Sequence, residues 1–167
     1  NNYKKFTIVR NPWDLVVSFY FHLRKPLSQT ELFSEGNISY LNPIEASMNA
    51  CKMDFKSWVK IYYDPYLRPR QIEETRVPYP VSHFYKQLDW ITNINGEILV
   101  DKILKFEEPN EWKNYLKGLG LKDTNDLDVK LNSSKRRVDY KYYYDDEIKN
   151  IIGQYFKKDI DKFDYKF

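Results

Sequence analysis

The order of apolar and polar positions predicts a short strand followed directly by a helix near the N-terminus. Phe6–Val9 is mostly apolar and rich in β-branched residues, which is typical of a short buried strand. Asn11 is a favoured N-cap, and Pro12 is a favoured first helical residue. Apolar residues then recur at helical spacing as far as about Lys25: Trp13, Val16, Val17, Tyr20 and Leu23. Arg10 therefore lies where the strand ends and the helix begins.

The same kind of pattern predicts further elements along the chain. Pro43–Tyr63 is helical in pattern, in one helix or two, with one apolar face: Ile44, Met48, Cys51, Phe55, Trp58 and Val59. Residues 84–90 favour a short strand or a helical turn, residues 104–106 a strand, and residues 111–119 a short helix. Asp145–Ile160 is the clearest helix, since acidic residues suit its first turn and six apolar residues form one stripe.

Residues 62–80 are expected to form a long basic loop. This stretch holds four prolines and three arginines: Pro65, Pro69, Pro78, Pro80, Arg68, Arg70 and Arg76. So many prolines interrupt any regular element. Loops of this length in a compact domain are often functional.

Composition and charge exclude several classes of protein. The 167 residues fit one domain, and 42% hydrophobic with 17% aromatic residues indicate a globular chain. The net charge of +3 is too small to indicate a nucleic-acid-binding protein. One cysteine and two histidines far apart do not make a metal site. No apolar run is long enough for a membrane span, so we expect a soluble protein.

The position of Arg10 favours an anion site, because free N–H groups at a helix start attract negative charge. Arg10-Asn11-Pro12-Trp13-Asp14, with Ser18 eight residues after Arg10, resembles the 3′-phosphate-binding motif of sulfotransferases. These enzymes use 3′-phosphoadenosine 5′-phosphosulfate (PAPS). The resemblance implies that Arg10 and Ser18 hold the 3′-phosphate of the nucleotide. It also implies an α/β fold, with a parallel sheet flanked by helices, similar to the P-loop NTPases.

Four further segments resemble carbohydrate-type and bacterial sulfotransferases: HFYKQLDWI, ILVDKILKFEEP, KLNSSKRRVDYKYYYDDE and FKKDIDKFDYKF. In the third segment, the resemblance implies that Lys135 and Arg136 contact PAPS, although a solvated basic patch is the alternative.

His83 is a candidate base for the acceptor hydroxyl, with a structural role as the alternative. Glu107 and Glu108 favour helix capping or a salt bridge. The tyrosines of residues 140–144 favour packing over a sugar platform.

The Lys/Gly/Ser-rich loop that cradles the phosphosulfate in this family is not found in the sequence. None of the five glycines lies in a strand–loop–helix cradle. We therefore expect residues 1–167 to be a single sulfotransferase-like domain that lacks its N-terminal strand, loop and helix. On that expectation, the chain alone is inactive and leaves a sheet edge exposed.

Two functions follow from these observations. The first is a sulfotransferase that moves the sulfuryl group from PAPS to a hydroxyl or amine, with a carbohydrate as the expected acceptor and no metal. The alternative is a non-catalytic module that binds a nucleotide or anion on the same scaffold. Partners would be PAPS or its product PAP and the acceptor, without nucleic acid. The expected location is the cytoplasm, or the Golgi lumen if a preceding segment anchors a eukaryotic protein.

Overall fold

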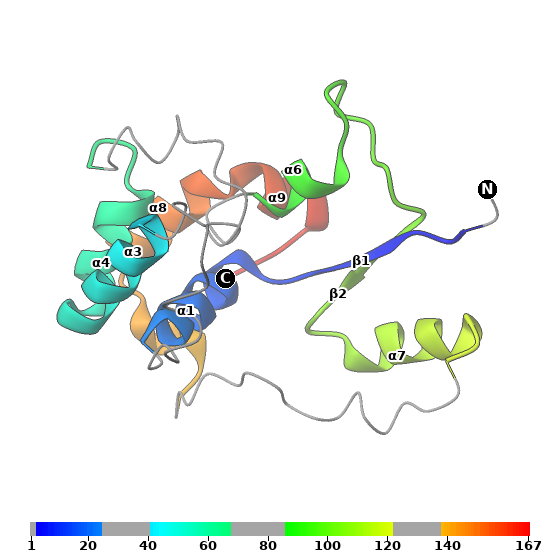
Figure 1. Ribbon diagram of the computed structural model, residues 1–167, viewed down its shortest axis with the longest axis horizontal. Helices are drawn as coiled ribbons and strands as arrows, with labels where there is room; N and C mark the ends of the chain where they lie inside the picture. The colour runs from blue at the N-terminus through cyan, green and yellow to red at the C-terminus, as the bar shows by residue number, and fades with distance from the viewer. Residues whose placement is uncertain (1–2, 25–40, 68–85, 122–137) are drawn as a thin grey trace.

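The computed structural model describes residues 3–24, 41–67, 86–121 and 138–167, which are coloured in Figure 1. Its helices are α1 (Pro12–Leu23), α3 (Leu41–Lys52), α4 (Phe55–Tyr63), α6 (Gln87–Ile91), α7 (Pro109–Gly118), α8 (Asp146–Tyr155) and α9 (Lys157–Phe163). A single 3-10 turn in these ranges is η4 (Tyr140–Tyr143), and the strands are β1 (Phe6–Val9) and β2 (Lys102–Lys105).

The two strands pair in parallel, with Phe6 opposite Lys102 and Val9 opposite Lys105. The pairing continues past β2, because the N–H of Phe106 donates to the carbonyl oxygen of Val9 at 2.7 Å. Helices connect the two parallel strands, and α7 packs against β2, so the predicted α/β fold is confirmed. Within the described ranges β1 pairs only with β2, so its other edge has no strand beside it there.

The core lies on the side of the molecule where α1, α3, α4 and α8 pack together (Figure 1). We call these four helices the helical side. Its fully buried side chains include Val16, Val17, Trp58, Tyr63 and Ile152. Aromatic rings meet edge to face throughout this core, as in the pair Tyr63 and Tyr155, whose centres lie 5.0 Å apart.

The segment Pro43–Tyr63, predicted to be helical in one helix or two, forms parts of two helices, α3 and α4. They are separated before α4, whose N-cap is Asp54. Asp54 Oδ1 accepts from the N–H of Ser57 at 3.0 Å. The predicted face is right for α4 and wrong for α3: Met48 is 50% exposed and Cys51 is exposed, whereas Ala46 and Ala50 are buried. The break at Asp54 resets the helical phase, so residues on its two sides do not share one continuous face.

The single helix predicted at Asp145–Ile160 is wrong, because the structure breaks it at Phe156. Phe156 ends α8 and precedes α9, and its side chain is fully buried. The bend turns the side chain of Asp159 into the interior, where it accepts hydrogen bonds from the start of α6. A remote partner therefore sets the direction of α9.

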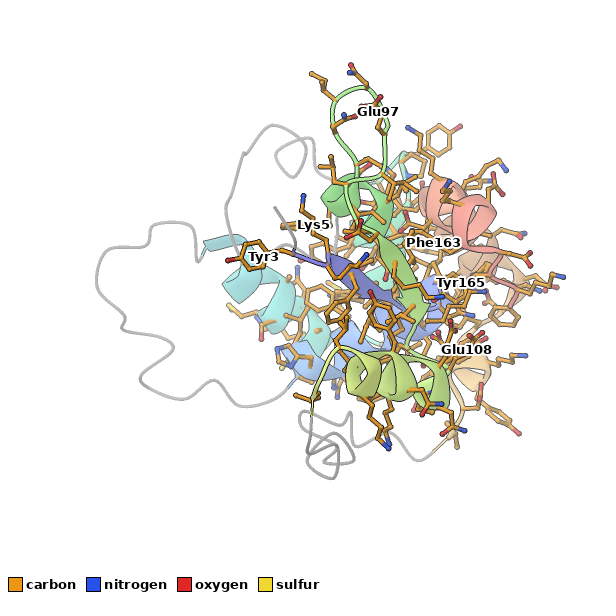
Figure 2. The ribbon with its side chains drawn as sticks, turned by 90° about the vertical axis from the view of Figure 1, so that its right-hand side faces the viewer. Tyr3, Lys5, Glu97, Glu108, Phe163 and Tyr165 are labelled. Carbon is orange, nitrogen blue, oxygen red and sulfur yellow. The ribbon has the colours of Figure 1, made fainter. Side chains whose placement is uncertain are left out.

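The strands and α7 form a second group, which we call the sheet side; Figure 2 views the molecule from this direction. No residue of α7 is buried, and Phe6 on β1 is 38% exposed. Only Val9 and Leu104 are buried within the two strands. No helix in the described ranges has both the length and the apolar character needed to cross a membrane.

Candidate anion-binding site

The junction between β1 and α1 is built as the local sequence predicts. Asn11 precedes the helix, and its side-chain oxygen accepts from the N–H of Trp13 at 3.1 Å. Pro12 is the first helical residue, where the absence of an N–H costs nothing. The capping role predicted for Asn11 is thus confirmed, and Arg10 lies between the last residue of β1 and this cap.

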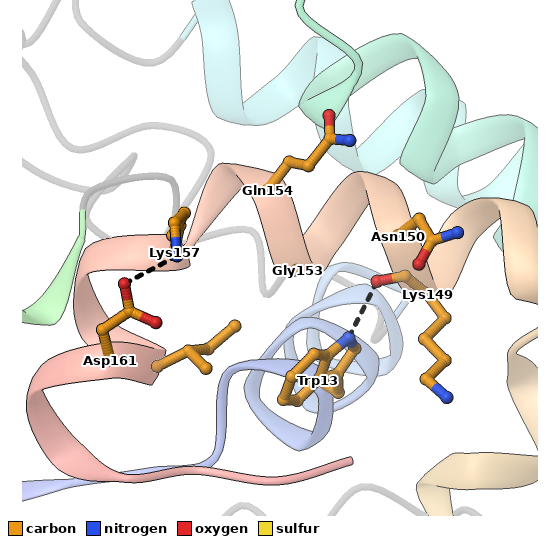
Figure 3. Close-up of a pocket in the computed structure, with 8 residues that line it drawn as sticks. Trp13, Lys149, Asn150, Gly153, Gln154, Lys157 and Asp161 are labelled. Carbon is orange, nitrogen blue, oxygen red and sulfur yellow. Dashed lines mark hydrogen bonds and ion pairs between the residues drawn. The ribbon is translucent and has the colours of Figure 1, made fainter.

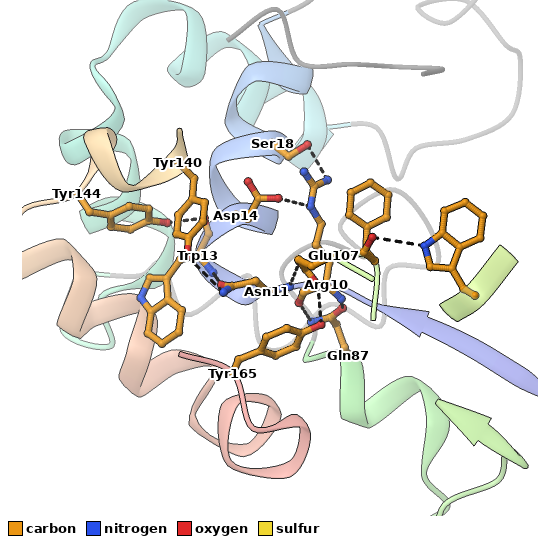
Figure 4. A network of polar contacts seen from close by, with 12 residues as sticks. Arg10, Asn11, Trp13, Asp14, Ser18, Gln87, Glu107, Tyr140, Tyr144 and Tyr165 are labelled. Atoms are coloured by element: carbon orange, nitrogen blue, oxygen red, sulfur yellow. Dashed lines mark hydrogen bonds and ion pairs between the residues drawn. The ribbon is translucent and has the colours of Figure 1, made fainter. Parts of the chain in front are cut away.

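The Arg10 side chain runs along one face of α1 (Figure 4). Its Nε donates to Asp14 Oδ2 at 2.6 Å, and its Nη1 donates to Ser18 Oγ at 3.1 Å. Asp14 and Ser18 are four residues apart on α1 and therefore lie on the same face of the helix, where the side chain of Arg10, which precedes the helix, meets both of them. The structure therefore brings together Arg10 and Ser18, the two residues that the sequence singles out. The ring of Phe106 lies against the guanidinium, with 4.6 Å between Arg10 Cζ and the ring centre.

This arrangement leaves hydrogen-bond donors directed away from Asp14. A guanidinium has five N–H groups, and the two bonds above use one on Nε and one on Nη1. The N–H groups of Nη2 have no hydrogen-bond acceptor within the described ranges. Ser18 Oγ accepts from Arg10, and in the part of the chain that the structure describes no contact uses the Ser18 O–H as a donor. Asp14 neutralises the guanidinium at its Nε edge, so an anion would have to approach the opposite edge.

The backbone N–H groups of Arg10, Asn11 and Trp13 are already bonded, which corrects the expectation of free groups at these three positions. The N–H of Arg10 donates to Gln87 Oε1, and that of Asn11 donates to Glu107 Oε1, each at 2.7 Å. The N–H of Trp13 is used by Asn11, and Pro12 has none. These three N–H groups are therefore not available to an anion, and the donors described at this site are the side chains of Arg10 and Ser18.

Glu107 joins the end of β2 to the start of α1. Its Oε1 accepts from Asn11, and its Oε2 accepts from the hydroxyl of Tyr165 at 3.2 Å. Burial raises the pKa of Tyr165, and the negative charge of Glu107 raises it further. Tyr165 therefore keeps its proton and remains a donor to Glu107.

The segment of tyrosines near residue 140 and the C-terminal residues contact the first turn of α1. Tyr144 donates its hydroxyl proton to the carbonyl oxygen of Trp13 at 2.9 Å, and Asn11 Nδ2 donates to the carbonyl oxygen of Lys166 at 3.0 Å. Tyr140 and Tyr143 pack against the core, as predicted, whereas Tyr142 is exposed. These side chains hold the helix start from the C-terminal part of the chain.

Several candidates lie outside the described residues. They are His83, Lys135 and Arg136, together with residues 68–80 of the basic loop. Within the described ranges, no group of three or more His, Cys, Asp or Glu side chains could hold a metal ion.

Sequence reasoning missed Gln87, Tyr144 and Tyr165 as parts of this site. Gln87 lies in the segment HFYKQLDWI and Tyr165 in FKKDIDKFDYKF, both of which carry the family resemblance. That resemblance was the one available signal, because a lone glutamine or tyrosine beside a short helix has no local pattern of its own.

A separate hollow of about 240 Å³ lies between the start of α1 and the helices α8 and α9 (Figure 3). Its wall includes the indole of Trp13, whose Nε1 donates to the carbonyl oxygen of Lys149 at 3.0 Å. Lys157 and Asp161, also in the wall, form an ion pair at 2.8 Å. Neither Arg10 nor Ser18 lines this hollow, so we place the candidate anion site elsewhere, on the face of α1.

Comparison with known families gives one match over nearly the whole chain. The model of the sulfotransferase family matches residues 1–166. No curated protein and no solved structure matches the chain. The matched range includes the β1–α1 junction and every contact described around Arg10.

Proposed function

Because the chain belongs to the sulfotransferase family, we propose that Arg10 and Ser18 bind the 3′-phosphate of PAPS in a sulfuryl transfer reaction. One observation carries this proposal: Arg10 Nη1 lies 3.1 Å from Ser18 Oγ, on the face of α1 that follows β1. A guanidinium and a hydroxyl that share one direction can both donate to the same phosphate. Charge-assisted bonds from arginine to phosphate are among the strong hydrogen bonds of proteins.

The residues around Arg10 fit a phosphate. Asp14 and Phe106 fix the guanidinium on its edge and on its face, so binding costs little side-chain entropy. The Asp14 carboxylate would repel an anion from its own side, which leaves the Nη groups and the Ser18 hydroxyl as the donors. PAPS, when bound, supplies the sulfuryl group. Arg10 and Ser18 hold and orient its nucleotide end.

We propose a hydroxyl or amine of a carbohydrate as the acceptor. The resemblance to carbohydrate-type sulfotransferases and the basic loop of residues 64–80 support this class, since a basic cleft attracts polar or anionic sugars. Lys135 and Arg136 are proposed as further contacts of PAPS, and His83 as a candidate base. Their support is the family resemblance of their segments.

The nucleotide proposal is tested by titrating PAP and adenosine 5′-phosphate into the protein and following the heat of binding. Arg10→Ala should weaken PAP binding by about 1.5–3 kcal/mol, the range for a hydrogen bond to a charged group. Binding of adenosine 5′-phosphate, which lacks the 3′-phosphate, should change much less. Equal losses for both ligands would overturn the assignment.

Arg24→Ala is a matched control, because Arg24 follows α1 directly at its C-terminal end. Arg24 donates to the hydroxyl of Tyr20 and to the carbonyl oxygen of Ala50, at the opposite end of α1 from Arg10. Its removal should leave the difference between the two ligands intact, provided that circular dichroism shows a folded protein.

The transfer itself is tested with PAPS labelled in the sulfuryl group and a panel of sugars, using the full natural chain. Label on a sugar supports the enzyme. Binding of PAP without transfer to any hydroxyl or amine acceptor would favour the alternative of a non-catalytic nucleotide-binding module.

A further inference from the structure

We propose that Gln87 is a positioning residue of the anion site, which fixes the Arg10 peptide and is itself held by buried Asp159. The proposal rests on the proposed role of Arg10 in binding the 3′-phosphate. Gln87 does not contact the Arg10 guanidinium among the contacts that the structure gives. It acts on the backbone from which that side chain extends (Figure 4).

Gln87 binds Arg10 at two points. Its Oε1 accepts from the N–H of Arg10 at 2.7 Å, and its Nε2 donates to the carbonyl oxygen of Arg10 at 2.8 Å. Both polar groups of the Arg10 backbone are thus used by one side chain. This geometry resembles that of a neighbouring strand, which also bonds the N–H and the C=O of a single residue. Because the Arg10 Cα lies between these two bonds, it cannot shift or rotate without breaking one of them.

Gln87 is fixed in turn by Asp159. Asp159 is fully buried, and its Oδ2 and Oδ1 accept from the N–H groups of Gln87 and Leu88, at 2.7 and 3.0 Å. These are the first two residues of α6, whose N-cap residue Lys86 supplies no side-chain bond. A carboxylate at a helix start is favourable, because it accepts hydrogen bonds that would otherwise be missing.

We call the contacts among Arg10, Gln87 and Asp159 the clamp. The clamp joins three parts of the chain that are far apart in sequence. Arg10 and Gln87 are separated by 77 residues, and Gln87 and Asp159 by 72. The position of the guanidinium relative to Ser18 therefore depends on the packing of α6 against α9. A displacement of about 1 Å in a binding group can reduce the rate of an enzyme up to about 100-fold, so such support matters for function.

The test compares the affinities of PAP and adenosine 5′-phosphate in Gln87→Met, which keeps the length of the side chain and removes both hydrogen bonds. The ratio of the two affinities measures the 3′-phosphate contact alone. We expect this ratio to fall about five- to tenfold, the effect of losing one or two hydrogen bonds, with the affinity for adenosine 5′-phosphate nearly unchanged. A purely structural role would lower the melting temperature or both affinities together and leave the ratio unchanged.

Gln154→Met is the matched control. Gln154 is exposed on α8, so the same change from glutamine to methionine is made away from Arg10, Gln87 and Asp159. Its ratio should equal that of the unmodified protein. If Gln87→Met does not fold, Gln87→Glu replaces it: a carboxylate still accepts from the Arg10 N–H but cannot donate to the carbonyl oxygen. An unchanged ratio in a folded Gln87 variant overturns the clamp.

Arg10→Ala separates this proposal from the proposed function. If Arg10→Ala leaves the ratio unchanged, the phosphate assignment itself fails. If Arg10→Ala lowers the ratio and the Gln87 variants do not, the assignment stands and only the positioning role of Gln87 is wrong.

Discussion

The helical side and the sheet side of this molecule differ in how they bury the same residue types. Phe156, between α8 and α9, is 0% exposed, whereas Phe6 on β1 is 38% exposed. The ring of Phe6 makes an edge contact with Tyr115 of α7, while the ring of Phe156 packs between Tyr63 and Tyr155. The stabilisation from the hydrophobic effect is roughly proportional to the apolar area that folding removes from water. The helical side therefore contributes most of the stability of the described fold.

The candidate site lies at the border of these two regions. Its side chains Asp14 and Ser18 belong to α1, on the helical side, and Phe106 follows β2 on the sheet side. The backbone at the site is held from both directions, by Gln87 and by Glu107. Asp14 and Ser18 on α1 thus orient the Arg10 side chain, and Phe106, which follows β2, packs against its guanidinium.

The largest expected effect comes from removing one phenylalanine from each side. Phe156→Ala should lower the free energy of unfolding by about 3–5 kcal/mol, the range for a buried aromatic residue cut to alanine. Phe6→Ala should lower it by about 1 kcal/mol, because the ring is partly in water and leaves no closed cavity. Urea unfolding curves of the two variants measure the difference. Similar losses would mean that the two regions do not differ in their contribution to stability.

A smaller effect distinguishes two helix caps. Asn11→Ala should cost about 1–2 kcal/mol, because this buried residue caps α1 and also donates to the carbonyl oxygen of Lys166. Asp54→Ala removes an exposed cap of α4 and should cost less. Asn11→Ser keeps a capping oxygen and loses the donor, so it should fall between Asn11→Ala and the unmodified protein. Urea unfolding gives all three values, and an Asp54 loss as large as the Asn11 loss would contradict this ranking.

Local signals explain which parts of the fold could be predicted. The strand at Phe6–Val9 and the Asn11 cap follow from neighbouring residues, although the burial predicted for the strand is wrong for Phe6 and Ile8, which are 38% and 39% exposed. Arg10 and Ser18 were singled out together by the family resemblance, and the structure places them in contact. The break at Phe156 could not be predicted, since the apolar stripe continues through it and the partner of Asp159 is 72 residues away. Gln87 could not be predicted as part of the site either, because Arg10, which it binds, is 77 residues away.

The expectation of free N–H groups at the start of α1 was wrong for Arg10, Asn11 and Trp13, for a related reason. Position at a helix start predicts that N–H groups need partners, but the sequence does not say which partner reaches them. Here the acceptors are Gln87 and Glu107, from two other elements. Tertiary contacts thus occupy the N–H groups of Arg10 and Asn11, which are not available to an anion.

The smallest expected effect compares two surface ion pairs whose exposure is alike. Lys56 pairs with Asp145 at 2.6 Å on the helical side, with side chains 45% and 46% exposed. Lys102 pairs with Glu111 at 2.9 Å on the sheet side, with 43% and 44% exposed. Since exposure does not separate the two pairs, Lys56→Met and Lys102→Met should both shift the urea midpoint less than Asn11→Ala does. Lys56→Met should have the larger effect of the two, because Lys56 also pairs with Glu147 at 3.0 Å.

The pH dependence of stability tests whether these two ion pairs act through their charges. Hydrogen bonds from Lys56 lower the pKa of Asp145, and hydrogen bonds from Lys102 lower that of Glu111. A carboxyl whose pKa is lower in the folded state adds stability above its unfolded pKa, near 4, and loses it as the pH falls through the folded pKa. Each lysine variant should therefore differ from the unmodified protein at pH 7 and approach it near pH 2, in urea midpoints measured at both values. A difference for Lys56→Met that persists undiminished at pH 2 would show that its side chain acts through packing against α8 and not through charge.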